Sequence, residues 1–145
     1  MGHRRIARER ALQALYQLDV QGAESGRPQD ALEAAWQAAA EAGEPAPPEE
    51  IRQFASELVT GVRQELATLD KLIEAHSHNW RVDRMSRIDR NVLRLGAYEL
   101  KYRPDVPKKV SLNEAVELGK RFGTEESSAF INGLLDKLAQ GIDKP

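Results

Sequence analysis

The stretch SLNEAVELGKRFGTEESSAFINGLLDKLAQG, residues 111–141, contains two helix-forming segments that meet at Gly123. Its first four residues have the Ser-x-x-Glu spacing of a capping box, which predicts a helix that begins at Ser111 and stops at Gly123. Thr124 is predicted to cap a second helix, which runs to Gly141. Apolar residues recur along this second segment at helical spacing, at Phe130, Leu134, Leu135 and Leu138.

The same helical period continues through the rest of the chain. Pro28 and Gly43 are predicted to begin and end one helix, and Ser86 is predicted to cap another through a capping box that has aspartate as its acid. A long periodic run that begins at Ile51 is predicted to break between residues 61 and 68. Because we find no alternating strand pattern, the sequence predicts an all-α fold of six or seven helices.

Composition excludes several classes of site. The chain has 145 residues, the length of one ordinary domain, and it contains no cysteine, so disulfides and thiolate metal sites are ruled out. We find no glycine-rich phosphate loop, no nucleophile elbow and no metal-binding histidine pattern. We therefore expect no catalytic residue, no metal and no cofactor. Because no signal peptide or membrane-spanning segment is visible, we also expect a cytoplasmic protein that does not enter a membrane.

Charge is distributed unevenly along a chain whose net charge is −2. Residues 1–10 carry +3 and residues 80–109 carry +5, whereas residues 19–57 carry −7. Such asymmetry favours a surface that contacts a polyanion.

Arginines in the first turn of a helix oppose its dipole, at a cost of about 0.3–1 kcal/mol each. Arg5, Arg8, Leu12 and Tyr16 follow one helical ridge that is predicted to flank the apolar face. Arginine contacts phosphate and tyrosine stacks on bases, so the ridge fits a single-stranded RNA platform. A solvated N-terminal turn with a half-packed tyrosine is the alternative. A second basic group contains Arg84, Arg87, Arg90 and Arg94. For these arginines we expect intramolecular ion pairs and not RNA contacts.

Four stretches of the chain together resemble the NusB family of bacterial transcription antitermination factors. They are RRIARERALQALYQLD, FASELVTGV, RIDRNVLRLGAYEL and VPKKVSLNEAVELGKRFGTEESSAFINGLLDKLA, in the family's order and spacing. The last of these stretches is the most specific to the family, whereas residues 21–50 contain no motif that is diagnostic of it. The resemblance implies one NusB-like domain over residues 1–145, built from two small helical bundles.

The resemblance also implies binding of the boxA element of ribosomal RNA leaders, as single-stranded RNA and together with the ribosomal protein NusE. The two proteins are expected to assemble with other Nus factors on RNA polymerase and to support ribosomal RNA synthesis. Asp89 matches a NusE-contacting position of the family. The expected RNA-contacting residues are Arg4, Arg5, Arg8, Tyr16, Glu126 and Phe130.

Two alternatives come from other functional classes. NusB-like modules also form the N-terminal part of some ribosomal RNA methyltransferases, but this chain lacks the glycine-rich cofactor loop that such an enzyme needs. The second alternative is a self-associating helical adaptor, in which a homodimer covers the flank at Leu12 and Tyr16.

Overall fold

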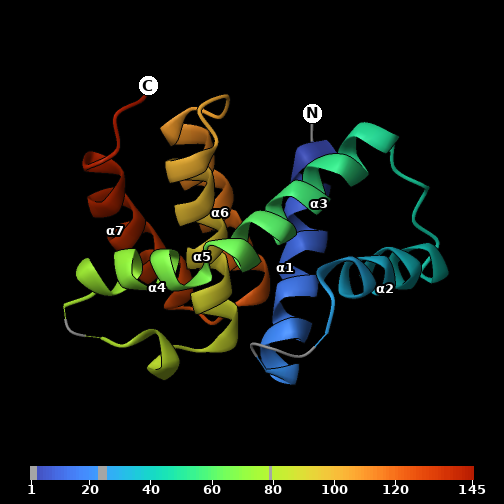
Figure 1. Cartoon of the computed structure of the whole chain (residues 1–145), viewed down its shortest axis with the longest axis horizontal. Helices are drawn as coiled ribbons and strands as arrows, with labels where there is room; N and C mark the ends of the chain where they lie inside the picture. Colours follow the sequence, from blue (N-terminus) through green and yellow to red (C-terminus); the bar gives the residue numbers. More distant parts are fainter. Residues whose placement is uncertain (1–2, 23–25, 79) are drawn as a thin grey trace. The chain divides into compact units, whose positions relative to one another are not determined.

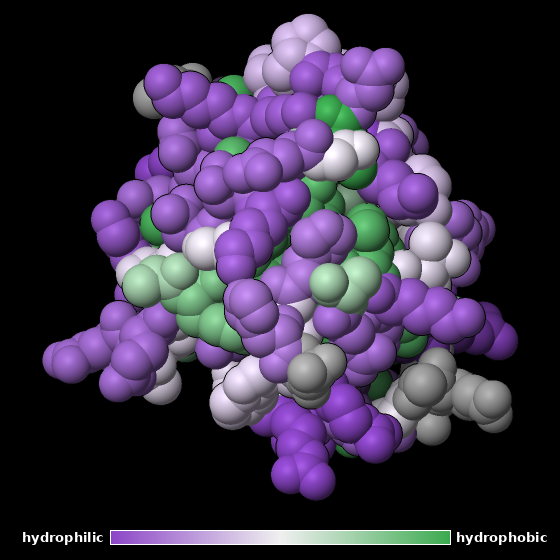
Figure 2. Space-filling view, turned by 90° about the vertical axis from the view of Figure 1, so that its left-hand side faces the viewer, coloured by the Kyte–Doolittle hydropathy of each residue, from purple (hydrophilic) through white to green (hydrophobic). Residues whose placement is uncertain are grey.

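A computed structural model describes residues 3–22, 26–78 and 80–145. The chain divides into two compact units, Met1–Gln64 and Glu65–Pro145. The described residues form seven α-helices and one short 3-10 helix and contain no strand, which confirms the predicted all-α class (Figure 1). No helix in these ranges is long and apolar enough to cross a membrane. The face drawn in Figure 2 is largely hydrophilic, with hydrophobic residues visible between the polar ones.

The first unit contains α1 (His3–Gln21), α2 (Pro28–Glu41) and α3 (Glu49–Gln64), and each of these helices packs against the other two. Small alanines on one face of α1 allow its neighbours to approach closely. The larger buried side chains of this unit are Leu12, Leu15, Leu18, Leu32, Trp36, Ile51, Phe54, Leu58, Val59 and Val62.

Both predicted ends of α2 are confirmed. Pro28 is the first helical residue, where a missing N–H costs nothing. At the other end Gly43 has φ +90°, and the N–H groups of Gly43 and Glu44 donate to the carbonyls of Ala40 and Ala39. This is a Schellman motif, and its left-handed residue favours glycine.

The second unit contains α4 (Leu66–Ala75), the 3-10 helix η1 (Val82–Arg84), α5 (Arg87–Tyr102), α6 (Lys108–Phe122) and α7 (Ser127–Gln140). Helix α5 contacts α4, α6 and α7, and nine of its residues are buried. The start of α4 at Leu66, after the end of α3 at Gln64, confirms the predicted break. The largest fully buried side chains of this unit are Leu69, Ile73, Leu93, Leu95, Leu100, Ile131, Leu135 and Leu138.

The serine half of the predicted capping box at Ser86 is confirmed, whereas the predicted capping box at Ser111 is wrong. The Ser86 Oγ accepts a hydrogen bond from the backbone N–H of Asp89 at 3.1 Å, so Ser86 caps α5. Helix α6 instead begins at Lys108, one turn before Ser111. Ser111 is 1% exposed, and its hydroxyl donates to the Glu99 carboxylate at 3.3 Å. Its side chain therefore joins α6 to α5 and is not available as a cap.

The predicted cap of α7 is also displaced. The N-cap residue is Glu126, and Thr124 lies in the preceding turn. The N–H of Thr124 donates to the Ser127 Oγ at 2.9 Å, which reverses the predicted direction of capping. A Cβ at Gly123 would lie 2.3 Å from the Ser127 Oγ and 2.8 Å from the Gly119 carbonyl oxygen, so the turn requires glycine at position 123.

The last residues of the chain stabilise the C-terminal end of α5. The Lys144 Nζ donates to the carbonyls of Glu99 and Arg103 at 2.9 and 2.8 Å. Each carbonyl also accepts a backbone N–H, from Arg103 and Val106 respectively, so Lys144 is a second donor to each. A cation is favoured at this end of a helix. The N–H of Lys108 also donates to the Pro145 carbonyl at 2.8 Å. Partial burial lowers the pKa of the Lys144 ammonium from its usual value.

Candidate nucleic-acid interface

The N-terminal turn of α1 presents arginines without any acid in that turn. Arg4 and Arg5 are exposed there. The Arg4 guanidinium lies 4.2 Å from the centre of the Phe54 ring on α3, within the range of a cation–π contact. This contact orients a cation at the end of the helix, where its charge is open to solvent.

Two of the opening arginines are buried. Arg8 is 4% exposed, and its guanidinium lies 5.4 Å from the centre of the Phe54 ring. Arg10 forms an ion pair with Glu44 in the connector between α2 and α3. Leu12 is 1% exposed, so the prediction that the ridge flanks the apolar face is wrong for Arg8 and Leu12. Long arginine side chains bury their stems against an aromatic ring and leave only part of the head to a partner.

The two exposed members of the ridge are Arg5 and Tyr16. Tyr16 is 40% exposed. The two residues are eleven positions apart, which places them about three helical turns and 16 Å apart on the same side of α1. One exposed arginine and one exposed aromatic ring therefore lie along the same side of a single helix.

A second group of predicted residues meets in the second unit, around a cavity of about 360 Å³ that we call the Trp80 cavity. The cavity brings together Asp89, Glu126 and Phe130, which the resemblance assigned to two different partners. The sequence predictions missed its remaining lining residues. The complete lining is Trp80, Arg84, Met85, Ser86, Asp89, Thr124, Glu126 and Phe130.

The cavity contains two carboxylates in different environments. The Glu126 side chain is exposed and accepts a hydrogen bond from the Thr124 hydroxyl at 3.2 Å. The Asp89 Oδ1 is buried and has no hydrogen-bond partner among the described residues. A buried acceptor without a hydrogen-bond partner is uncommon in proteins, so a donor from a ligand would be favourable at this position.

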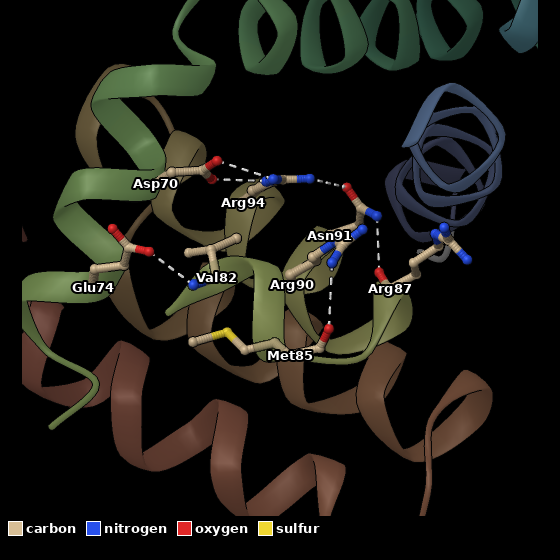
Figure 3. A network of polar contacts seen from close by, with 8 residues as sticks. All are labelled: Asp70, Glu74, Val82, Met85, Arg87, Arg90, Asn91 and Arg94. Atoms are coloured by element: carbon tan, nitrogen blue, oxygen red, sulfur yellow. Dashed lines mark hydrogen bonds and ion pairs between the residues drawn. The ribbon is translucent and has the colours of Figure 1, made fainter. Parts of the chain in front are cut away.

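Residues 80–86 form one wall of the cavity. Helices α4 and α5 hold this segment through two hydrogen bonds, which Figure 3 draws. The Glu74 Oε2 on α4 accepts from the backbone N–H of Val82 at 2.8 Å. From α5, the Arg90 guanidinium donates to the Met85 carbonyl at 3.4 Å.

Beside these contacts, Arg94 forms a bidentate ion pair with Asp70, with N–O distances of 2.8 and 2.9 Å, and also donates to Asn91. The prediction of intramolecular ion pairs in the second basic group is therefore right for Arg94. Arg84 and Arg87 are exposed, and neither forms an ion pair within the described residues.

The NusB family model matches residues 5–140 of the chain. The Transcription antitermination protein NusB of Myxococcus xanthus is 63% identical over all 145 residues and is covered completely by the alignment. The protein of the same name from Sorangium cellulosum is 46% identical over 144 residues, which are 99% of this chain and 96% of the relative.

Solved structures agree with this match. NusB of T. maritima superposes with a TM-score of 0.84 at 32% identity, over 96% of this chain and 92% of that one. A chain from a crystal structure of the antitermination factors NusB and NusE in complex with double-stranded RNA gives a TM-score of 0.81 at 26% identity. The superposition covers 97% of this chain and 98% of that chain.

Proposed function

The chain belongs to the NusB family of transcription antitermination proteins, and we propose that it binds the boxA element of ribosomal RNA leaders together with NusE. The observation that carries this proposal is the 63% identity to an antitermination protein, in an alignment that covers both chains completely. The factor would deliver boxA RNA and NusE to RNA polymerase, where other Nus factors join them. It would act in the cytoplasm by binding alone, without catalysis.

The α1 arginines support RNA binding on physical grounds. Arg4 and Arg5 supply exposed guanidinium groups, which contact phosphates in a forked geometry. Tyr16 supplies a stacking face on the same side of the helix as Arg5, and bases stack readily on such faces. Arg8 is 4% exposed and lies against the Phe54 ring, so its role in the interface would be to orient its neighbours.

In the second unit we assign Glu126 and Phe130 to RNA and Asp89 to NusE. All three line the Trp80 cavity, so RNA and NusE would meet at adjoining surfaces. Neighbouring contacts of this kind allow each ligand to strengthen the binding of the other, because binding of one orders side chains that the other uses. We infer that the two units act as one RNA-binding domain over residues 1–145.

Fluorescence anisotropy of a labelled boxA RNA tests the proposal. The protein should prefer boxA to a scrambled RNA of equal length, and NusE should increase that preference. Equal, weak and salt-sensitive binding to both RNAs, unchanged by NusE, would refute the proposal.

Variants of α1 then locate the interface. Arg5→Gln should reduce the slope of log affinity against log salt by about 0.7, the loss of one phosphate contact on a single strand. Arg27→Gln removes an equal charge from an exposed position beside α2 and should leave the slope unchanged. Tyr16→Ala should cost about 1–3 kcal/mol with little change in slope, whereas Tyr16→Phe should keep most of the affinity.

A further inference from the structure

We propose that the Trp80 cavity is a nucleotide subsite, in which one unstacked base lies against Trp80 and Arg84 contacts the adjoining phosphate. This inference rests on the proposed RNA-binding function and adds two residues, from the segment that joins α4 to α5, to the interface. Four observations support it: the exposure of Trp80, the size of the cavity, the placement of charge around it and the way residues 80–86 are held.

Trp80 is 57% exposed, the largest exposure of any large hydrophobic residue among the described ones. The other tryptophan, Trp36, is 7% exposed. An indole that faces solvent leaves unfavourable apolar surface in contact with water, and a stacked base removes that surface. Stacking platforms for single-stranded nucleic acid are aromatic faces of this kind.

The cavity suits a single base in size and lining. Its volume of about 360 Å³ lies near the lower end of the range for small-ligand pockets. Phe130 on α7 and Met85 on the 80–86 segment supply further apolar surface. A planar group in the cavity would therefore contact apolar side chains from two segments of the chain.

The charged residues that line the cavity suit both the base and the phosphate of a nucleotide. The exposed Glu126 carboxylate repels phosphate but accepts hydrogen bonds from the N–H groups of a base. Arg84 lines the same cavity and is exposed. Because it has no ion pair within the described part of the chain, its guanidinium can contact a phosphate without first breaking one.

The 80–86 segment is fixed in advance of binding. Trp80 itself exchanges two hydrogen bonds with Ser77, from the Ser77 Oγ to the Trp80 carbonyl at 2.6 Å and from the Trp80 N–H to the Ser77 carbonyl at 3.1 Å. Val82 is held by Glu74, as described above. A backbone held in this way loses little conformational entropy when the base arrives.

The test uses the intrinsic fluorescence of Trp80. Because the chain has only two tryptophans, Trp36→Phe leaves Trp80 as the single indole emitter. Titration of this variant with boxA RNA should quench its emission, with the same midpoint as the anisotropy titration. Trp80→Ala should weaken boxA binding about 5- to 150-fold, and Trp80→Phe should restore most of the affinity.

A matched pair of arginine variants tests the phosphate contact. Arg84→Gln should lower the salt slope by about 0.7. Arg81→Gln changes an equally charged, exposed neighbour that is paired with Asp83 at 3.1 Å, and it should leave the slope unchanged. Far-UV circular dichroism of each variant should match that of the parent chain.

The outcomes separate this inference from the proposed function. If boxA RNA binds but neither quenches Trp80 nor responds to Trp80→Ala, the subsite is refuted and the proposed function stands. If NusE alone quenches Trp80 and boxA RNA adds nothing to that quenching, the cavity binds protein only, which also refutes the subsite. If boxA RNA does not bind in preference to its scrambled control, the proposed function fails and the subsite fails with it.

Discussion

Asp70→Asn should strongly destabilise the second unit, although it replaces only one carboxylate oxygen by an amide nitrogen. The Asp70 carboxylate accepts from the Nε and Nη2 groups of Arg94, at 2.8 and 2.9 Å. Asparagine keeps the shape but offers a single oxygen, and its amide nitrogen would face one of the two guanidinium donors. The guanidinium would then lose its counter-charge and one acceptor while remaining largely buried, with 11% of its side chain exposed.

The structure sets the size of the effect. Removing one partner of a fully buried ion pair costs about 3–5 kcal/mol. The Asp70 side chain is 26% exposed, so solvent screens part of the lost interaction. We therefore expect a loss of about 2–3 kcal/mol in the free energy of unfolding.

Urea unfolding followed by circular dichroism measures this loss. Asp136→Asn is the control, because it makes the same chemical change at an exposed position of α7 in the same unit. A double variant with Asp70→Leu and Arg94→Met should be less destabilised than the sum of its single changes by at least about 1 kcal/mol. If Asp70→Asn costs no more than Asp136→Asn, the ion pair does not stabilise the α4–α5 contact.

The remaining predictions concern backbone fit, pH and the C-terminal tail. Gly123→Ala should cost about 1–3 kcal/mol because its Cβ would collide with the backbone. Gly133→Ala should stabilise the protein by about 0.5–1 kcal/mol because no atom lies within 4 Å of the added Cβ. Thermal melts of the two variants measure both effects. Burial, and to a smaller extent the Glu65 carboxylate, raise the pKa of Tyr102 above 10.0. Because the tyrosine then ionises at a lower pH in the unfolded chain, the free energy of unfolding should fall as pH rises through and above 10. Tyr102→Phe should flatten that fall in urea titrations across this range. Lys144→Met should cost about 0.5–1.5 kcal/mol and speed carboxypeptidase digestion, because the carbonyls of Glu99 and Arg103 each lose one of two donors. Equal digestion rates would contradict this.

Predictions from local sequence succeeded where the physical cause is local. The helical period, the proline at the start of α2, the glycine after it and the Ser86 cap all depend on residues within about one turn of each other. The Ser111 motif failed despite a correct local pattern. Its hydroxyl donates to Glu99, twelve residues earlier, and that partner has no mark in the local sequence.

The candidate interface divides in the same way. The basic start of α1 is visible in the sequence, but the burial of Arg8 depends on Phe54, a residue of another helix. The resemblance to the NusB family identified Asp89, Glu126 and Phe130 one by one. Their meeting around one cavity required the fold, because the lining comes from three segments of the chain.

By itself, the sequence determined an all-α fold of six or seven helices with a basic first turn. Local dihedral preferences and apolar spacing are enough for that, whereas the NusB family was identified from the resemblance of four longer stretches. Only the tertiary structure decided which arginines are buried, which serine caps a helix, and that the exposed Trp80 stands beside Phe130. Burial and pairing depend on partners that are distant in the chain, and chain folding alone brings those partners together.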